Sequence, residues 1–167
     1  MKNKFLILLV LSLFNIANSY ADSVIQDAMA KWQSYIVVSS NMPHSQLVSL
    51  AREASISNTV MVLNGFTNKE NSIPGVQQFI SEINSECCEK LNASRWIINP
   101  KIAQRYHISS APTFLIARGE STANGDYSLL SGDFDLANAL KYFAQHSNSS
   151  KIRQQATIIY QNSYQAH

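Results

Sequence analysis

The most reactive side chains in the sequence are those of two adjacent cysteines, Cys87 and Cys88. Neighbouring Cα atoms lie about 3.8 Å apart, below the roughly 4.4–6.8 Å that is usual for a disulfide. Consecutive side chains on a helix also diverge by about 100°, so in a helical segment we expect no bond between the two. Cys87 is predicted to lie in the core with Ile83 and Ile80. Cys88 is the candidate reactive thiol, either free or in an intermolecular bridge, and neither cysteine is predicted to be catalytic.

The histidines do not indicate a second kind of chemistry. They are dispersed, at positions His44, His107, His146 and His167. No His or Cys pair has the spacing of zinc ligands, so we predict no metal and no cofactor. Ser39 and Ser40 precede His44, but this proximity in sequence does not make a nucleophile and base, and we predict no catalytic residue.

The N-terminal residues have the composition of a secretory signal peptide. Lys2 and Lys4 precede an apolar run that ends at Phe14, and small residues at Ser19 and Ala21 suit a signal peptidase. We therefore predict a signal peptide over 1–21 and a mature chain in the periplasm. The apolar run is shorter than the roughly 20 residues that span a bilayer, although an uncleaved N-terminal anchor is the alternative.

Charge argues against nucleic acid as a ligand. The formal net charge is +2, and the 13 Lys and Arg residues are scattered along the chain. No basic stretch is long enough to follow a phosphate backbone, so a nucleic-acid partner is not expected.

Apolar spacing predicts alternating strands and helices along most of the chain. The expected elements are an amphipathic helix over 22–34, a strand over 35–39, a helix from Pro43 to Asn58, a strand over 59–63, a helix over 72–91, a strand over 95–98, a short helix opened by Asn99 and Pro100, paired strands over 111–116 and 125–130, and a helix capped by Asp133. This order predicts an α/β fold with helices on both faces of a central sheet. Residues 147–167 are rich in Ser, Asn and Gln, which predicts a flexible C-terminal tail.

The segment from Trp96 to Ile116 resembles the half of thioredoxin-like proteins in which a short helix leads into a cis-proline strand. The resemblance implies a three-layer domain over 35–146 with a mixed sheet, a helical insertion before the cis-proline half, and a cis Ala111-Pro112 bond. Redox members carry C-x-x-C where this chain has Asn41, Met42, Pro43 and His44. Neither Asn41 nor His44 can form a mixed disulfide, so the resemblance predicts no oxidoreductase activity here. A groove between Asn41, Met42 and Pro43 on one side and Ala111 and Pro112 on the other is the candidate site for an extended peptide of a partner.

Within this superfamily the chain resembles the TrbC family of F-type conjugative transfer proteins. The matching segments are 38–43, 62–65, 98–106, 111–114, 132–133 and 139–140. The chain departs from the family pattern at Ser40 and Asn41, where aliphatic and aromatic residues are usual, and at Ala111, where valine is usual. These departures leave the expected fold unchanged but concern the surface that would meet a partner.

The resemblance implies a periplasmic assembly factor for a conjugative pilus of a type IV secretion system, acting by protein–protein binding beside TraW-like and TraU-like proteins. Two other functions are compatible with the residues. One is a thiol-dependent isomerase or chaperone that uses Cys88, and the other is a peptide-binding module unrelated to conjugation. A thiol of depressed pKa at Cys88 would favour the first of these.

Overall fold

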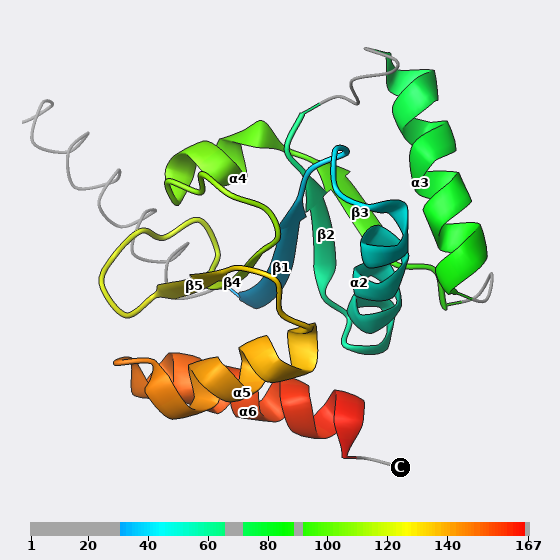
Figure 1. Ribbon diagram of the computed structural model, residues 1–167. Coiled ribbons are helices and arrows are strands. Elements are labelled where there is room, and N and C mark those ends of the chain that lie inside the picture. Colours follow the sequence, from blue (N-terminus) through cyan, green and yellow to red (C-terminus); the bar gives the residue numbers. More distant parts are fainter. Residues whose placement is uncertain (1–30, 66–71, 89–91, 166–167) are drawn as a thin grey trace, which may run out of the picture. The chain divides into compact units, whose positions relative to one another are not determined.

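A single mixed sheet of five strands forms the centre of the domain (Figure 1). The computed structural model describes residues 31–65, 72–88 and 92–165. The strands are β1 (Trp32–Val38), β2 (Val60–Leu63), β3 (Arg95–Ile98), β4 (Thr113–Arg118) and β5 (Tyr127–Ser131), in the spatial order β3-β2-β1-β4-β5. β1, β2 and β3 run parallel, whereas β4 is antiparallel to β1, and β5 is antiparallel to β4.

This strand order confirms the thioredoxin-like fold class. A β1-helix-β2 unit and a β4-β5-helix unit share the central strand pair β1 and β4, and the Ala111-Pro112 peptide before β4 is cis, as the resemblance implied. The predicted helical insertion is also present, since helix α3 and strand β3 lie between the two units in the sequence. Parallel strands need crossover connections, which α2 and α3 supply.

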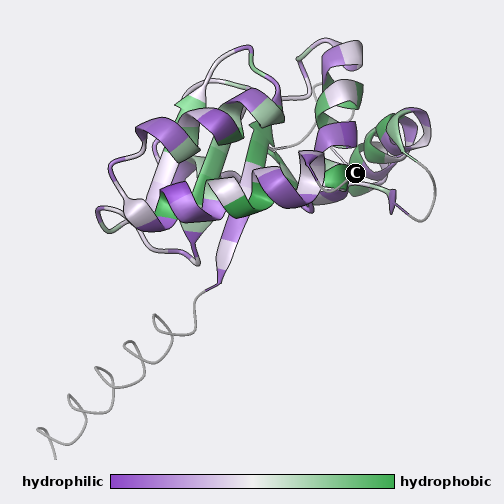
Figure 2. Ribbon diagram, turned by 90° about the horizontal axis from the view of Figure 1, so that it is seen from below, coloured by the Kyte–Doolittle hydropathy of each residue, from purple (hydrophilic) through white to green (hydrophobic). Residues whose placement is uncertain are grey.

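Helices cover the two faces of the sheet unequally. The larger core lies under α2 (His44–Ile56), α3 (Ile73–Cys87), α5 (Leu136–His146) and α6 (Ser150–Tyr164), and it contains Phe114, Phe143 and Ile36. The smaller core lies under α4 (Pro100–Arg105) and contains Val62, Leu115 and Tyr106. The view from below shows hydrophobic strands behind helices whose visible faces mix hydrophilic and hydrophobic residues (Figure 2).

The predicted flexible tail over 147–167 is wrong for the residues that the structure describes. Residues 150–164 form α6, which packs along α5 and buries Ile152 and Ala156 in the larger core. These two residues lie four positions apart on one face of a mostly polar helix, so polar composition concealed a helical stripe. Residues 166–167 lie outside the described part of the chain.

The predicted N-terminal helix over 22–34 is wrong at its C-terminal end. Trp32, Gln33 and Ser34 belong to β1, where they pair with Arg118, Ala117 and Ile116 of β4. Pairing with a buried strand outweighed the helical spacing of the local sequence, which is a weaker determinant. The rest of this predicted helix and the predicted signal peptide over 1–21 lie outside the described residues.

Two helix ends also differ from the sequence prediction. α3 ends at Cys87, earlier than the predicted end at Leu91, because Cys88 is in an extended conformation with φ −141° and ψ 147°. The N-cap of α5 is Asp135, whose carboxylate accepts from the Asn138 N–H, and not Asp133. The predicted Asn99 cap is confirmed, since its side chain accepts from the Lys101 N–H at 3.1 Å.

Candidate functional site

Two loops meet at the end of the sheet where β1 finishes and β4 begins. Val37 pairs with Thr113, so Pro112 lies beside the end of β1, and the chain leaving β1 turns at once into the Met42-Pro43 loop. The Met42 N–H donates to the Ser39 carbonyl at 3.2 Å, which closes that turn. The structure therefore places the residues of the predicted groove at one end of the sheet. Of these, Met42 is half-buried against the larger core and Pro112 is buried, whereas the other three, Asn41, Pro43 and Ala111, are exposed.

Phe134 extends this surface, although no motif of the sequence predicts its position there. The Gly132 N–H donates to the Pro112 carbonyl at 3.1 Å, and a Cβ at Gly132 would lie 2.7 Å from the ring of Phe134. Gly132 also has φ +140°, a conformation that side chains with a Cβ rarely adopt. The ring thus lies against the backbone beside Pro112, and Phe134 is 43% exposed. We refer to Asn41, Met42, Pro43, Ala111, Pro112 and Phe134 as the Met-Pro edge.

Polar contacts from α2 hold the loops of the Met-Pro edge. Gln46, in the first turn of α2, donates to the Asp133 carboxylate at 2.7 Å. Farther along α2, Glu53 accepts from the Leu136 N–H at the start of α5. Burial raises the pKa of Glu53, this backbone hydrogen bond opposes the rise, and the charge of Asp135 adds to it. The segment that carries Phe134 is therefore fixed to α2 on both sides.

The Met-Pro edge holds no pair of sulfur atoms at the place of the C-x-x-C motif. Pro43 is the N-cap of α2, no side chain caps this helix, and His44 is its first residue. His44 Nε2 lies 3.0 Å from Glu86 Oε1 of α3. The exposed His44 side chain therefore forms an ion pair with Glu86 when it is protonated. The helix start is thus available for a partner's backbone but carries no nucleophile.

The two cysteines form a disulfide, which the sequence analysis had excluded. The Cys87–Cys88 S–S distance is 2.01 Å, and neither cysteine of the chain is a free thiol. The exclusion was wrong because it placed both residues on a helix. Cys88 has left α3 with extended backbone angles, so its side chain can turn back to Cys87. The prediction of Cys88 as a reactive free thiol is accordingly also wrong, whereas Cys87 is buried in the larger core as predicted.

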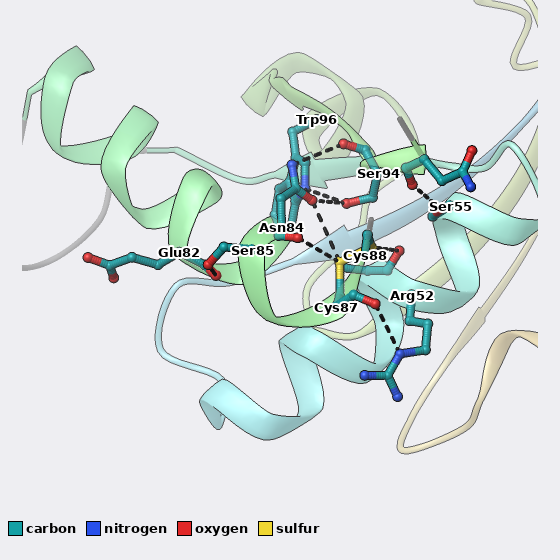
Figure 3. Close-up of a disulfide and its surroundings, with 11 residues drawn as sticks. Arg52, Ser55, Glu82, Asn84, Ser85, Cys87, Cys88, Ser94 and Trp96 are labelled. Carbon is teal, nitrogen blue, oxygen red and sulfur yellow. Dashed lines mark hydrogen bonds between the residues drawn. A yellow bond between two sulfur atoms is a disulfide. The ribbon is translucent and has the colours of Figure 1, made fainter. Parts of the chain in front are cut away.

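The disulfide lies against α2 and beside a tryptophan (Figure 3). The Arg52 Nε–H donates to the Cys87 carbonyl at 3.1 Å, and Cys88 Sγ lies 3.9 Å from the Ala51 carbonyl. On the other side, Cys87 Sγ lies 3.8 Å from Asn84 Oδ1, which also accepts from the Trp96 Nε1–H at 3.3 Å. The disulfide thus lies where the end of α3 contacts α2 and approaches Trp96 of β3.

The remaining histidines do not gather at either place. His107 follows α4 with φ +53°, and His146 stacks on Tyr142 in the last turn of α5, with ring centroids 4.8 Å apart. His167 lies outside the described residues. Within the described ranges no group of three His, Cys, Asp or Glu residues could hold a metal ion.

The fold and the edge together define a thioredoxin-like protein whose active-site position carries no cysteine pair. The model of the type-F conjugative transfer system pilin assembly protein family matches residues 36–143. The chain therefore belongs to this family, the TrbC family, as its motifs suggested. The match covers both loops of the Met-Pro edge and the Cys87–Cys88 disulfide.

Two solved structures resemble the chain. One is a secreted Mycobacterium tuberculosis disulfide oxidoreductase homologous to E. coli DsbE, with 13% identity, a TM-score of 0.41, and coverage of 77% of this chain and 80% of that one. The other is MTB dsbF in its mixed oxidized and reduced forms, with 10% identity, a TM-score of 0.44, and coverage of 80% and 84%. At these identities nothing follows for the activity of this chain. A comparison with curated proteins found no match.

In the part of the chain that the structure describes, no helix is long and apolar enough to cross a membrane.

Proposed function

We propose that this pilin assembly protein acts without catalysis, by binding another protein of the conjugative pilus machinery at the Met-Pro edge. The observation that carries the proposal is the arrangement of the edge. A proline loop, the cis-proline segment and the exposed ring of Phe134 meet where redox relatives of the fold place their cysteines, and no sulfur pair stands there. A thioredoxin-like edge of this kind keeps its peptide-docking surface and lacks its chemistry.

The chemistry of the edge supports an extended, partly apolar segment as the occupant. Met42 and Phe134 offer apolar contact area, while the start of α2 offers backbone N–H groups that no side chain caps. An extended peptide can satisfy such groups with its own carbonyls and place alternate side chains on the apolar residues. Family membership favours a partner from pilus assembly, such as a TraW-like or TraU-like protein, over a module unrelated to conjugation.

The isomerase alternative is less well supported than binding. An isomerase needs a thiolate that attacks the substrate disulfide. The start of α2 has none, and Cys87 and Cys88 are bonded to each other. In keeping with an assembly role in conjugation, we place the mature chain in the periplasm, after removal of the predicted signal peptide.

The experiment is capture of partners by the tagged full chain from a conjugating cell. The wild type is expected to retain at least one pilus-assembly protein. Phe134→Ser is expected to lower its recovery about tenfold, because the loss of one central aromatic contact costs about 1.4 kcal/mol or more of binding.

The matched control is Ile158→Ser on α6, since Ile158 is 40% exposed and Phe134 is 43% exposed. This control is expected to capture as the wild type does. Equal losses in both variants, or full capture by Phe134→Ser with an unchanged melting temperature, would refute the Met-Pro edge as the docking site. Capture only of client proteins through mixed disulfides would refute the non-catalytic assignment.

A further inference from the structure

The Cys87–Cys88 disulfide is not placed where a disulfide would stabilise the fold. A disulfide stabilises a protein chiefly by constraining the unfolded chain, and the effect grows with the length of the loop that it closes. The two cysteines are adjacent in sequence, so this bond closes the shortest loop that a chain can form. It also links no two elements covalently, because Cys87 is the last residue of α3 and Cys88 is its C-cap. Its effect is therefore local.

That local effect is to end α3. Side chains at consecutive helical positions diverge by about 100°, so a bond between adjacent cysteines and a helix that continues through both exclude each other. Cys88 accordingly has extended backbone angles, although its N–H still donates to the Asn84 carbonyl as a helical residue would, at 3.2 Å. The apolar spacing of the sequence predicts a longer helix, so the bond opposes the local preference of the chain.

The two cysteines differ in their exposure. Cys87 is 8% exposed and belongs to the larger core, whereas Cys88 is half-buried at the surface of that core. An attacking thiolate must approach a sulfur atom in line with the bond that it breaks, so access decides which sulfur reacts. Cys88 is therefore the point of entry.

We propose that the Cys87–Cys88 pair is a redox-exchange site that takes a dithiol protein as its reductant and sets the end of α3. The first thiolate of the dithiol attacks Cys88 Sγ, the bond between the two cysteines breaks, and Cys87 leaves as a thiolate that takes up a proton. The second thiolate of the dithiol then attacks its own sulfur in the mixed disulfide and releases Cys88, which is protonated in turn. The dithiol becomes a disulfide, and this chain gains two electrons and two protons.

Reduction has a defined structural consequence. Once the bond is broken, Cys88 can take helical backbone angles, and the contact of its sulfur with the Ala51 carbonyl of α2 is lost. Trp96 reports the change, because its Nε1–H shares the Asn84 carboxamide oxygen that lies against Cys87 Sγ. The disulfide contacts α2 at Ala51 and Arg52, which are not residues of the Met-Pro edge.

The test uses the isolated, folded chain in a series of dithiol–disulfide buffers without denaturant, followed by alkylation of free thiols and mass spectrometry. The expected result is a reversible two-electron transition in which the peptide with both cysteines carries either no alkyl group or two. Trp96 emission should change in parallel, and Trp96→Phe should abolish the change while Trp32 still emits. A bond that is reduced only when the chain unfolds, or two free thiols under oxidising conditions, would overturn the proposal.

Two single variants test the assignment of the entry point. Cys87→Ser leaves the more exposed cysteine, and Cys88→Ser leaves the buried one. Cys87→Ser is expected to form a mixed disulfide with oxidised glutathione several-fold faster. Equal rates in the two variants would refute entry through Cys88. Because no partner is present, failure here leaves the capture experiment at the Met-Pro edge unaffected.

Discussion

Redox thioredoxin-like proteins have a proline-lined edge and a cysteine pair at the same place. In this chain the two are separate: the Met-Pro edge has the prolines, and the end of α3 has Cys87 and Cys88. The edge has a proline loop beside a cis-proline segment, but it has no cysteine. The end of α3 has the cysteine pair, but the proline loop and the cis-proline segment lie elsewhere. Both contact α2, the edge at its start and the disulfide at its middle, through Ala51 and Arg52.

This separation bears on what the fold is used for. A catalyst of disulfide exchange needs its substrate's backbone and its own thiolate within reach of each other. In this chain Asn41 and His44 stand at the C-x-x-C positions, and their side chains cannot attack a disulfide. Binding without exchange at one site, and exchange without substrate selection at the other, are the functions that such an arrangement allows.

The largest expected effect comes from placing a cysteine pair at the edge. The double variant Asn41→Cys and His44→Cys, made together with Cys87→Ser and Cys88→Ser, creates a C-x-x-C motif at the start of α2. The N-terminus of a helix lowers the pKa of a thiol, so the motif is expected to cycle between dithiol and disulfide. Catalysed reduction of insulin by dithiothreitol should rise from background to a clear rate.

The control for this variant is Asn41→Ser and His44→Ser in the same background, which should remain at background. If the edge with cysteines fails to cycle although the variant keeps the wild-type circular dichroism spectrum, the comparison breaks down. The edge would then lack the geometry of a redox site as well as its sulfur.

The second effect concerns how α3 is held. Ile83 of α3 is fully buried in the larger core. Its truncation to alanine is expected to lower the free energy of unfolding by about 2–4 kcal/mol. Urea unfolding measures this loss, and Ile80→Ala, at a half-buried position on the same helix, should cost less. If the Met-Pro edge and the end of α3 are independent, Ile83→Ala should speed reduction of the disulfide. Partner capture, measured at a low temperature at which the variant stays folded, should not change. Loss of capture in a folded variant would show that the regions are coupled.

Local patterns predicted those parts of the fold that local residues determine. Asn99 followed by Pro100 is a helix start whose cap depends on neighbouring backbone, and the structure confirms it. α6 was not predicted from the sequence. Its composition is mostly polar, and the two apolar residues that it buries, Ile152 and Ala156, are too few to indicate a helix on their own. What makes the helix form is burial against α5, which the segment's own composition does not show.

Only those parts of the site that carry a recognisable motif could be predicted from the sequence. The proline loop and the cis-proline segment carry recognisable residues, so their meeting at one end of the sheet followed from the fold class. Phe134 gave no such signal, because its position depends on the contact of its ring with Gly132 and on the hydrogen bond from Gly132 to Pro112. The disulfide was missed because its formation depends on one residue, Cys88, leaving the helix.

A smaller effect tests how α2 holds the segment that carries Phe134. Burial raises the pKa of Glu53 above the usual 4.5, so the folded chain binds this proton more tightly than the unfolded chain does. Stability must then fall as the pH rises from about 4.5 through the raised pKa. Glu53→Gln keeps an oxygen for the Leu136 N–H and removes the charge, so its stability relative to the wild type should increase with pH over that range. Urea unfolding from acidic to neutral pH measures this, and Glu82→Gln, an exposed position on α3, is the control. Parallel profiles for the two variants would contradict burial as the cause.

The smallest expected effect lies in the one ion pair between the two regions that the described residues contain. His44, which follows Pro43 of the Met-Pro edge, and Glu86, which precedes Cys87, have side chains 50% and 56% exposed, so solvent screens their attraction. A double-mutant cycle with His44→Ala and Glu86→Ala is expected to give a coupling of about 0.2–0.5 kcal/mol when His44 is protonated, falling at high salt. Run on the oxidised and the reduced chain, the cycle also measures whether the end of α3 moves on reduction. A coupling that is present only with the disulfide intact would mean that redox exchange at Cys88 reaches the Met-Pro edge through Glu86. An unchanged coupling would mean that the chain keeps binding and exchange independent, as the distribution of its sulfur atoms suggests.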